Sequence, residues 1–491
     1  MTGSQKAEKS PLSGFLSYFY GNFIVLLLGF IQTPLVTRLM TADEYGKTGM
    51  FETTVSMLYI FAILGMDQTY IRYYYKNGID RGRLLKNCLT VSLILVGVLI
   101  VIYTACSGSA NMFLFGKTGL DITLLVIAYT LISVFERYFF LDVRMQQNGK
   151  LYSNINITQK ILNILLIVVA VFFLGNDFRV VLYAMTLSWG TTTLFLVIRY
   201  FYLKKNKEIY IAENSDEAEV RSYPVKELLS YGAPYILVLL MEWLLSSCDR
   251  VAIRTWSSFE ELGIYTAAMK IMVLLITFKT TFVAFWSPVA MEKYENASQE
   301  NCRIFFKRAF DVTRTLCALA AIMLILFRGV IVLLLGRDYR GADRLIPFLT
   351  LMPVFAMLFE ITNQGIKFVK KNMYLNIASA AAIIINISGN ALMVPVLGGL
   401  GAAMTTGISY IIYFAIGSFV AERFYRVGYD YLRTGITAFV LITECFAAVY
   451  MDLIPSVFVA LAGVVLLAFL EKESYIFMFK YIKGYLKRGK N

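Results

Sequence analysis

The chain has 491 residues, of which 58% are hydrophobic and 16% are charged, and its formal net charge at pH 7 is +13. The mean hydropathy of +0.64 excludes a water-soluble globular protein. There is no histidine, which removes the usual proton shuttle and any Ser-His or Cys-His catalytic pair. There is also no Cys-x-x-Cys spacing and no Walker loop for phosphate, so we expect no metal, no cofactor and no enzymatic activity.

Apolar stretches long enough to cross a bilayer, at about 20 residues each, follow one another along the chain. The predicted spans cover residues 15–39, 48–74, 85–105, 120–142, 153–174, 178–200, 227–254, 261–290, 303–336, 345–368, 373–396, 401–423, 433–451 and 454–470. The first run is too long for a signal-peptide core and no cleavage site follows it, so we expect it to remain as a membrane helix. We predict an all-α polytopic membrane protein with about fourteen transmembrane helices.

The first six predicted spans and the next six repeat one pattern. One apolar run ends at Arg38 and is followed by a turn that contains Glu44, and another ends at Arg254 and is followed by a turn that contains Glu261. The two glutamates are 217 positions apart (261 minus 44). We predict a bundle at 1–200, a cytoplasmic linker at 201–226, a repeat bundle at 227–423, and two extra helices with a basic tail at 424–491. A duplicated bundle is typical of transporters whose two halves move around a central path.

The positive charge predicts the orientation of the chain. Most of the 46 lysines and arginines lie in the two tails and the even-numbered connections, such as Lys367, Lys370 and Lys371. The positive-inside rule therefore predicts that both termini are cytoplasmic. For the basic C-terminal tail we favour contact with anionic lipids over nucleic acid. The short external connections leave no room for a domain that polymerises or ligates sugars.

Charged and polar side chains inside the predicted spans are the candidate functional residues, because burying them in a bilayer is costly. Glu242, Ser246, Asp249 and Arg250 have the spacing of one helix face, and Asn156 and Asn163 lie on the same stripe as Lys160. The alternative for these groups is hydrogen bonding or ion pairing that only joins helices. For Arg314, three residues after Asp311, a local salt bridge is the simplest account.

From their positions we predict three sets of site residues. The expected cationic, substrate-binding set is Arg72, Arg137, Lys160, Arg250, Lys270, Lys279 and Arg314. The expected polar lining is Asn156, Asn163, Ser246, Asn386 and Asn390, and the acids that we consider for ion coupling are Glu52, Glu242 and Asp249. A modest excess of cations favours an anionic passenger, above all one that carries phosphate or pyrophosphate.

Two stretches carry a resemblance to a known family. Arg38-Leu39 followed by Asp43-Glu44-Tyr45-Gly46 and then Leu64-Gly65-Met66 resembles the opening of polysaccharide transporters, as does the stretch from Asp249 to Lys270. These transporters are the O-antigen and capsule-repeat flippases of the multidrug/oligosaccharidyl-lipid/polysaccharide (MOP) exporter superfamily. Among the candidate cations, Arg72, Arg250 and Lys270 lie on positions that match the motif.

The resemblance implies a V-shaped pair of six-helix bundles around a central cavity. It also implies an undecaprenyl-pyrophosphate-linked oligosaccharide as substrate, moved across a bacterial cytoplasmic membrane by an ion gradient or membrane potential rather than by ATP. We further expect contacts with membrane lipids and with other polysaccharide-assembly proteins, but not with nucleic acid. The alternatives are a peptidoglycan-precursor flippase, a multidrug exporter of the same superfamily, or a non-transporting scaffold of a polysaccharide-assembly complex.

Overall fold

The structure is a computed structural model that describes residues 11–76, 79–205, 223–473 and 475–476. The polar residues 1–10, most of the predicted linker and the basic tail from 477 onward lie outside the described residues. Helices make up nearly all of the described part, and they divide into two compact units, residues 1–243 and 244–491. Thirteen described helices, or fourteen when one bent pair is counted as a span, are long and apolar enough to cross a membrane. The predicted fold class is confirmed.

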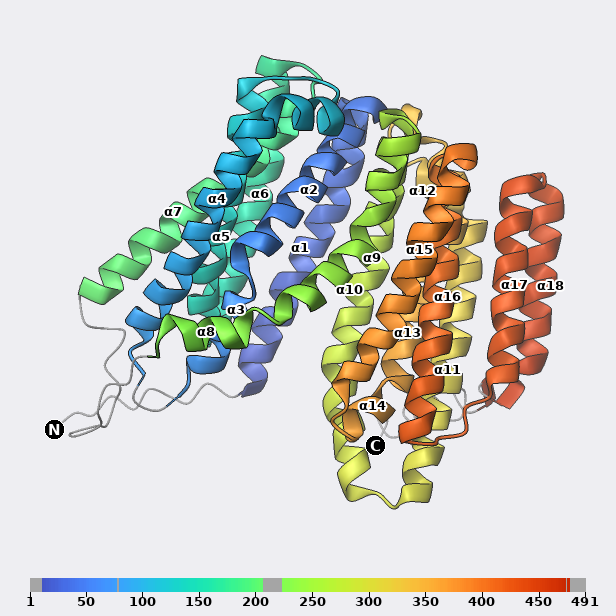
Figure 1. Ribbon diagram of the computed structural model, residues 1–491. Helices are drawn as coiled ribbons and strands as arrows, with labels where there is room; N and C mark the ends of the chain where they lie inside the picture. Colours follow the sequence, from blue (N-terminus) through green and yellow to red (C-terminus); the bar gives the residue numbers. More distant parts are fainter. Residues whose placement is uncertain (1–10, 77–78, 206–222, 474, 477–491) are drawn as a thin grey trace, which may run out of the picture. The chain divides into compact units, whose positions relative to one another are not determined.

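Unit 1 contains the first six spans, whose long helices run side by side (Figure 1). Its helices are α1 (Pro11–Leu39), α2 (Ala42–Ile63), α3 (Met66–Tyr73), α4 (Arg81–Phe115), α5 (Leu120–Met145), α6 (Gly149–Leu174), α7 (Arg179–Lys205) and α8 (Val225–Gly232). Helix α9 (Tyr235–Trp256) begins in this unit and continues into the next. Within unit 1, α1 packs against α6, α5 packs against α7, and α4 packs against α2 and α5.

The second span of unit 1 is broken, which the sequence pattern did not predict. Leu64 and Gly65 both have left-handed backbones, with φ of 45° and 68°, and α2 and α3 meet there at 52°. The break lets α3 lie against α8, where a Cβ added at Gly65 would come within 2.1 Å of the carbonyl oxygen of Gly232. Glycine is needed here because it tolerates positive φ and allows this close approach of two backbones.

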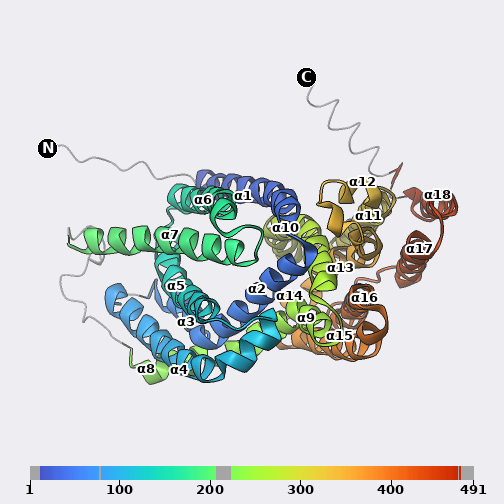
Figure 2. The ribbon, with the colours of Figure 1, turned by 90° about the horizontal axis from the view of Figure 1, so that it is seen from above.

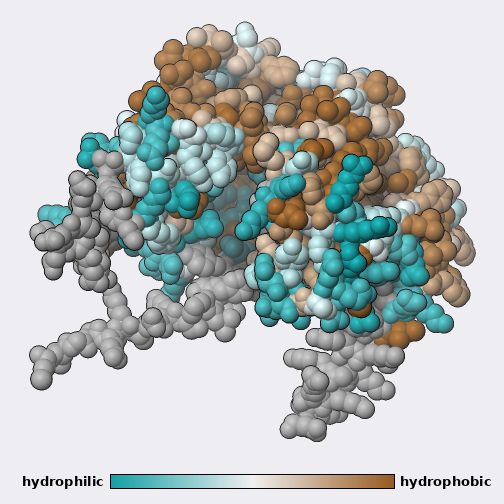
Figure 3. Space-filling model, turned by 60° about the horizontal axis from the view of Figure 1, so that its bottom comes forward, coloured by the Kyte–Doolittle hydropathy of each residue, from teal (hydrophilic) through white to brown (hydrophobic). Residues whose placement is uncertain are grey.

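Unit 2 contains the rest of α9 and the helices that follow it. Its helices after α9 are α10 (Phe259–Asn296), α11 (Gln299–Leu326), α12 (Arg328–Val332), α13 (Ala342–Thr362), α14 (Gln364–Phe368), α15 (Leu375–Leu397), α16 (Gly399–Phe424), α17 (Tyr431–Tyr450) and α18 (Leu453–Leu470), with 3-10 turns at Arg337–Tyr339 and Asn372–Tyr374. The 38 residues of α10 span about 57 Å, well beyond the thickness of a bilayer core. Figure 3 shows hydrophilic side chains gathered where α10 meets α11.

Helix α13 is the centre of unit 2, and most of its side chains are buried. It packs against α10, α11, α16 and α17, which explains why its sequence is apolar on every face. Helices α17 and α18 lie at one edge of the unit and contact α11, as Figure 2 shows from above.

The edge helices are held by a buried ion pair. Arg314 of α11 donates from Nε to Glu471 at 2.7 Å and from Nη2 to the same carboxylate at 2.9 Å. Nη1 of Arg314 donates to the hydroxyl of Thr434 in α17 at 3.2 Å. The predicted salt bridge from Arg314 to Asp311 is also present, at 3.0 Å. The side chain of Arg314 has no exposed surface, and it joins α11 to the ends of α17 and α18. Its place in the substrate-binding set stays a prediction.

Candidate functional site

A buried polar site in unit 2 surrounds the carboxylate of Asp249 on α9, whose residue surface is 2% exposed. Oδ1 accepts hydrogen bonds from the side-chain amides of Asn386 at 3.0 Å and Asn390 at 2.7 Å, both on α15. Oδ2 accepts from the hydroxyls of Tyr265 at 2.7 Å and Thr406 at 2.6 Å, on α10 and α16. Four neutral donors from three other helices therefore surround one carboxylate, as expected for a buried acid.

Unit 1 has a smaller polar cluster at the matching place in the repeat. Gln32 of α1 lies near the position that the predicted repeat pairs with Asp249, and its side-chain amide donates to Asn163 of α6 at 2.9 Å. The amide of Asn163 in turn donates to Ser188 of α7 at 3.3 Å. In the described contacts, the cluster in unit 1 is made of amide and hydroxyl groups, whereas the cluster in unit 2 surrounds a carboxylate. That difference makes Asp249 the candidate for cation or proton coupling.

Each unit also has an ion pair between its second and fourth spans. In unit 1, the guanidinium of Arg137 on α5 binds Asp67 on α3, with an Nη2–Oδ2 distance of 2.6 Å. In unit 2, Lys279 on α10 binds Glu360 on α13, with an Nζ–Oε1 distance of 3.3 Å. The cation is thus on the fourth span in one unit and on the second span in the other. Both cations remain partly exposed, with 32% and 23% of the side-chain surface accessible, and both stay in the proposed substrate-binding set.

The repeated turns after α1 and α9 have a common role. The backbone N–H groups of Glu44 and Glu261 donate to Thr41 and Ser258, which cap α2 and α10. The carboxylate of Glu44 accepts from the backbone N–H of Phe178 at 2.9 Å, and that of Glu261 accepts from Gly399 at 3.0 Å. Each glutamate therefore joins the start of the second span to the start of the sixth span in its own unit.

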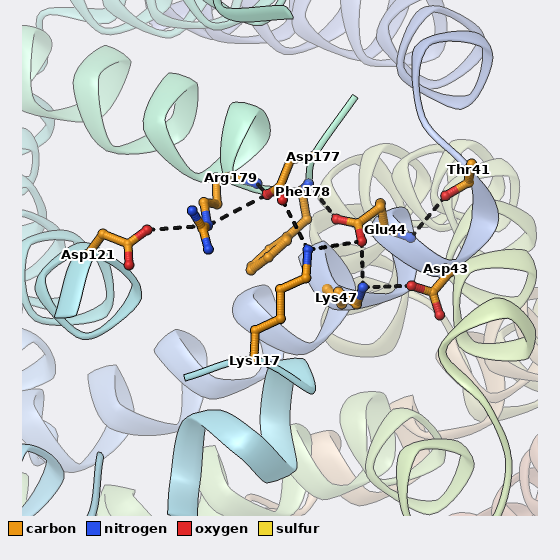
Figure 4. Close-up of polar contacts among 9 residues, drawn as sticks. All are labelled: Thr41, Asp43, Glu44, Lys47, Lys117, Asp121, Asp177, Phe178 and Arg179. Carbon is orange, nitrogen blue, oxygen red and sulfur yellow. Dashed lines mark hydrogen bonds and ion pairs between the residues drawn. The ribbon is translucent and has the colours of Figure 1, made fainter. Parts of the chain in front are cut away.

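In unit 1 this join extends into a network of ion pairs (Figure 4). Lys117 binds both Glu44, at 3.5 Å, and Asp177, at 3.1 Å, while Arg179 binds Asp121 at 3.2 Å. Burial raises the pKa of Asp177, but the backbone N–H of Arg179 and the ammonium of Lys117 outweigh it, so that this pKa lies below its usual value. The network fixes the connections at one end of unit 1.

The remaining predicted residues have varied environments. Arg72, Glu242 and Ser246 are exposed, so the helix face predicted from Glu242 to Arg250 is divided between an exposed part and the buried Asp249. Lys160 and Asn156 on α6 are half-buried. Nζ of Lys160 lies close to α1, since a Cβ added at Gly29 would be 3.8 Å from it. Glu52, Arg250 and Lys270 are also half-buried, and each interacts with at least one other residue.

Sequence reasoning did not place three residues in the candidate site that the structure brings next to its cations. Asp67 and Glu360 are the partners of predicted cations, but they are distant in sequence from Arg137 and Lys279, so spacing alone could not pair them. Lys367 was assigned to membrane orientation, yet its ammonium lies 3.7 Å from Glu360. The signal available for Lys367 was its position seven residues after Glu360, about two helical turns along. Within the described ranges, no group of three or more acidic, histidine or cysteine side chains is placed to hold a metal ion.

The fold is shared with solved membrane transporters. A structure of the lipid II flippase MurJ in an inward closed conformation matches with a TM-score of 0.64 and 13% identity, covering 94% of this chain and 99% of that one. An inward-facing multidrug resistance MATE family transporter of the MOP superfamily matches with a TM-score of 0.59 and 17% identity, covering 81% of this chain and 95% of that one. The chain is therefore a multi-pass membrane protein that shares the fold of these two proteins.

The sequence comparison identifies the family. The family model described as "polysaccharide biosynthesis protein" matches residues 12–293, more than half of the chain, and the chain belongs to this family. An uncharacterized membrane protein of Methanocaldococcus jannaschii is 23% identical over 433 residues, which cover 84% of this chain and 83% of that protein.

Proposed function

We propose that the protein is a flippase that moves undecaprenyl-pyrophosphate-linked oligosaccharide units across the bacterial cytoplasmic membrane for surface polysaccharide synthesis. The observation that carries the proposal is the placement of partly exposed cations inside the spans of a polysaccharide-family protein. Arg137 and Lys279 are each oriented by one acid from another helix, and each keeps part of its surface accessible. An ammonium or guanidinium held in this way binds phosphate oxygens by charge and hydrogen bonds.

In the proposed cycle the pyrophosphate binds to the cationic set, which also includes Arg72, Lys160, Arg250 and Lys270. Polar side chains such as Asn156 and Ser246 accept the sugar hydroxyls, while the lipid tail stays in the bilayer. Asn163, Asn386 and Asn390 support the clusters around Gln32 and Asp249 rather than lining the path, since all three are buried. Movement of the two repeats then exposes the substrate to the opposite side of the membrane.

Coupling to an ion is assigned to Asp249. Its carboxylate is surrounded by oxygen and nitrogen groups that reorient when a proton or a cation binds there, and the surrounding helices α9, α10, α15 and α16 all belong to unit 2. A change at Asp249 therefore changes the packing among these helices. Glu52 and Glu242 are the other acids considered for coupling; Glu242 is exposed and Glu52 is half-buried, whereas Asp249 is buried.

The second candidate is a flippase for a peptidoglycan precursor, which is favoured by the similarity of the fold to the lipid II flippase. The fold is also similar to that of a multidrug resistance transporter. However, the excess of cationic side chains in the spans would repel cationic drugs. A non-transporting scaffold predicts that charge removal inside the spans leaves function intact in a folded protein.

The test is complementation of a bacterial host that lacks its own O-antigen flippase. Wild type is compared with Arg250→Ala, Lys160→Ala and Lys270→Ala at matched levels in the membrane. Restored surface polysaccharide with wild type, and its loss in the variants, supports translocation through a cationic path. Rescue by every variant contradicts the assigned residues and favours the scaffold, whereas rescue of a strain that lacks its lipid II flippase instead favours the second candidate.

A further inference from the structure

A cluster of four side chains in unit 2 has more positive than negative charge. This lysine–glutamate cluster consists of Lys279 on α10, Glu360 on α13, Lys367 on α14, and Asn363 between the last two helices. Glu360 Oε1 lies 3.3 Å from Lys279 Nζ, and Oε2 lies 3.7 Å from Lys367 Nζ. The amide of Asn363 donates to Oε2 at 3.0 Å.

One carboxylate cannot neutralise two ammonium groups, so the cluster keeps a net charge of about +1 when all three groups are ionised. Lys279 and Lys367 are close enough to repel one another. The three charged side chains are only 18–25% exposed, so water screens this repulsion less than at an open surface. The arrangement therefore favours an added anion, and a doubly charged one above a singly charged one.

The backbone break beside these lysines contains two buried acceptors without partners in the described part of the chain. They are Oδ1 of Asn363 and Oε1 of Gln364, on residues that are 5% and 1% exposed. An unpartnered buried acceptor raises the free energy of a conformation. The side-chain ammonium groups of the neighbouring lysines are donors of the kind that these two oxygens lack.

We propose that the lysine–glutamate cluster binds the diphosphate group of the lipid-linked sugar, an inference that rests on the proposed function for the identity of the ligand. Phosphate oxygens bind Lys279 and Lys367, and Glu360 is the internal anion that they displace. Without ligand, Glu360 holds the two lysines in place across α10, α13 and α14. With ligand, its charge opposes that of the phosphates and limits the affinity, which allows release.

The experiment measures binding of inorganic pyrophosphate to the full chain in nanodiscs of phosphatidylcholine by titration calorimetry. Lys367→Met weakens binding about tenfold to a hundredfold, because one charge-assisted contact is lost. It leaves Glu360 paired with Lys279, so folding is retained. Glu360→Gln has the opposite effect and tightens binding about tenfold, because the competing negative charge is removed. Lys370→Met is the matched control, since Lys370 is exposed in the same segment, and it binds like wild type.

Equal weakening by Lys367→Met and Lys370→Met overturns the site, because only general positive charge would then matter. Weaker rather than tighter binding by Glu360→Gln also overturns it, since Glu360 would then be purely structural. Nanodiscs that contain phosphatidylglycerol separate the two sources of phosphate. If phosphatidylglycerol displaces pyrophosphate from wild type, the ligand is an ordinary phospholipid headgroup and the assignment to the lipid-linked sugar is wrong. Pyrophosphate binding without complementation refutes the proposed function alone and leaves the anion site in place.

Discussion

The ion pair between Arg314 and Glu471 makes a strong prediction about how α17 and α18 are held. Replacing Arg314 with methionine removes the guanidinium that binds Glu471, whose side chain is 1% exposed. Breaking a buried ion pair on one side costs about 3–5 kcal/mol, because an uncompensated charge stays buried. The local free energy that holds the edge helices on α11 falls by about that amount.

Cys445 of α17 reports this change directly. Its side chain is buried, and its thiol donates to the carbonyl of Pro347 in α13 at 3.2 Å. In a chain whose other cysteines are replaced by alanine, a maleimide reacts with Cys445 only when α17 opens from α13. At about 1.4 kcal/mol per tenfold change, Arg314→Met raises the rate of labelling by about a hundredfold or more.

Two further variants control the experiment. Arg433→Met breaks a partly exposed pair with Asp430, whose side chain is 32% exposed, and changes the labelling rate little, because ion pairs open to water contribute under about 1 kcal/mol. The double change Arg314→Met with Glu471→Met restores slow labelling, since both charges of the fully buried pair are removed together. If Arg314→Met labels no faster than Arg433→Met, the reasoning that this pair holds the edge helices is refuted.

Four other predictions follow from the structure. Gly65→Ala destabilises unit 1 by more than about 1 kcal/mol because of its positive φ and the contact with Gly232, whereas Gly97→Ala, with open space at its Cβ, is neutral or slightly stabilising; thermal unfolding in detergent compares them. Asp249→Asn abolishes complementation, since the amide turns an N–H toward groups that now donate to Asp249, while the exposed Glu242→Gln retains it; the reverse result moves ion coupling to Glu242. Glu44→Gln and Glu261→Gln each lower the midpoint of thermal unfolding, and Glu260→Gln, one residue earlier, does not; equal effects would show that the bonds to Phe178 and Gly399 contribute nothing. The folded-state pKa of Asp177 is depressed, so its ionised carboxylate stabilises the protein above its ordinary pKa near 3.8, and this stabilisation is lost as the pH falls below that value. Asp177→Asn therefore makes the midpoint of thermal unfolding less dependent on pH in the acid range. An unchanged pH dependence in this variant would contradict the assignment.

The sequence predicted the spans well because hydrophobic length is a direct consequence of bilayer thickness. It did not predict the break at Leu64 and Gly65, because an isolated glycine in an apolar run is compatible with a continuous helix. The close contact that requires the break involves Gly232, which lies far along the chain.

For the site, sequence spacing identified charged residues but not their partners. Asp249, Asn386 and Asn390 were all singled out, and the structure joins them into one cluster, but Tyr265 and Thr406 carried no signal in an apolar background. Helical spacing correctly paired Arg314 with Asp311, yet the partner that buries it, Glu471, is 157 positions away. Long-range pairing of this kind depends on how helices pack, which local periodicity does not record.

The most direct test of the central claim is transfer of the substrate between bilayer leaflets. Purified protein is reconstituted into liposomes with an undecaprenyl-pyrophosphate-linked oligosaccharide, and a glycosidase added outside measures the fraction of sugar that becomes accessible. We predict that wild type moves the inner-leaflet sugar outward under an imposed ion gradient, and that Arg137→Ala with Lys279→Ala does not. Equal transfer in liposomes with wild type, with the double variant and without protein would contradict the account.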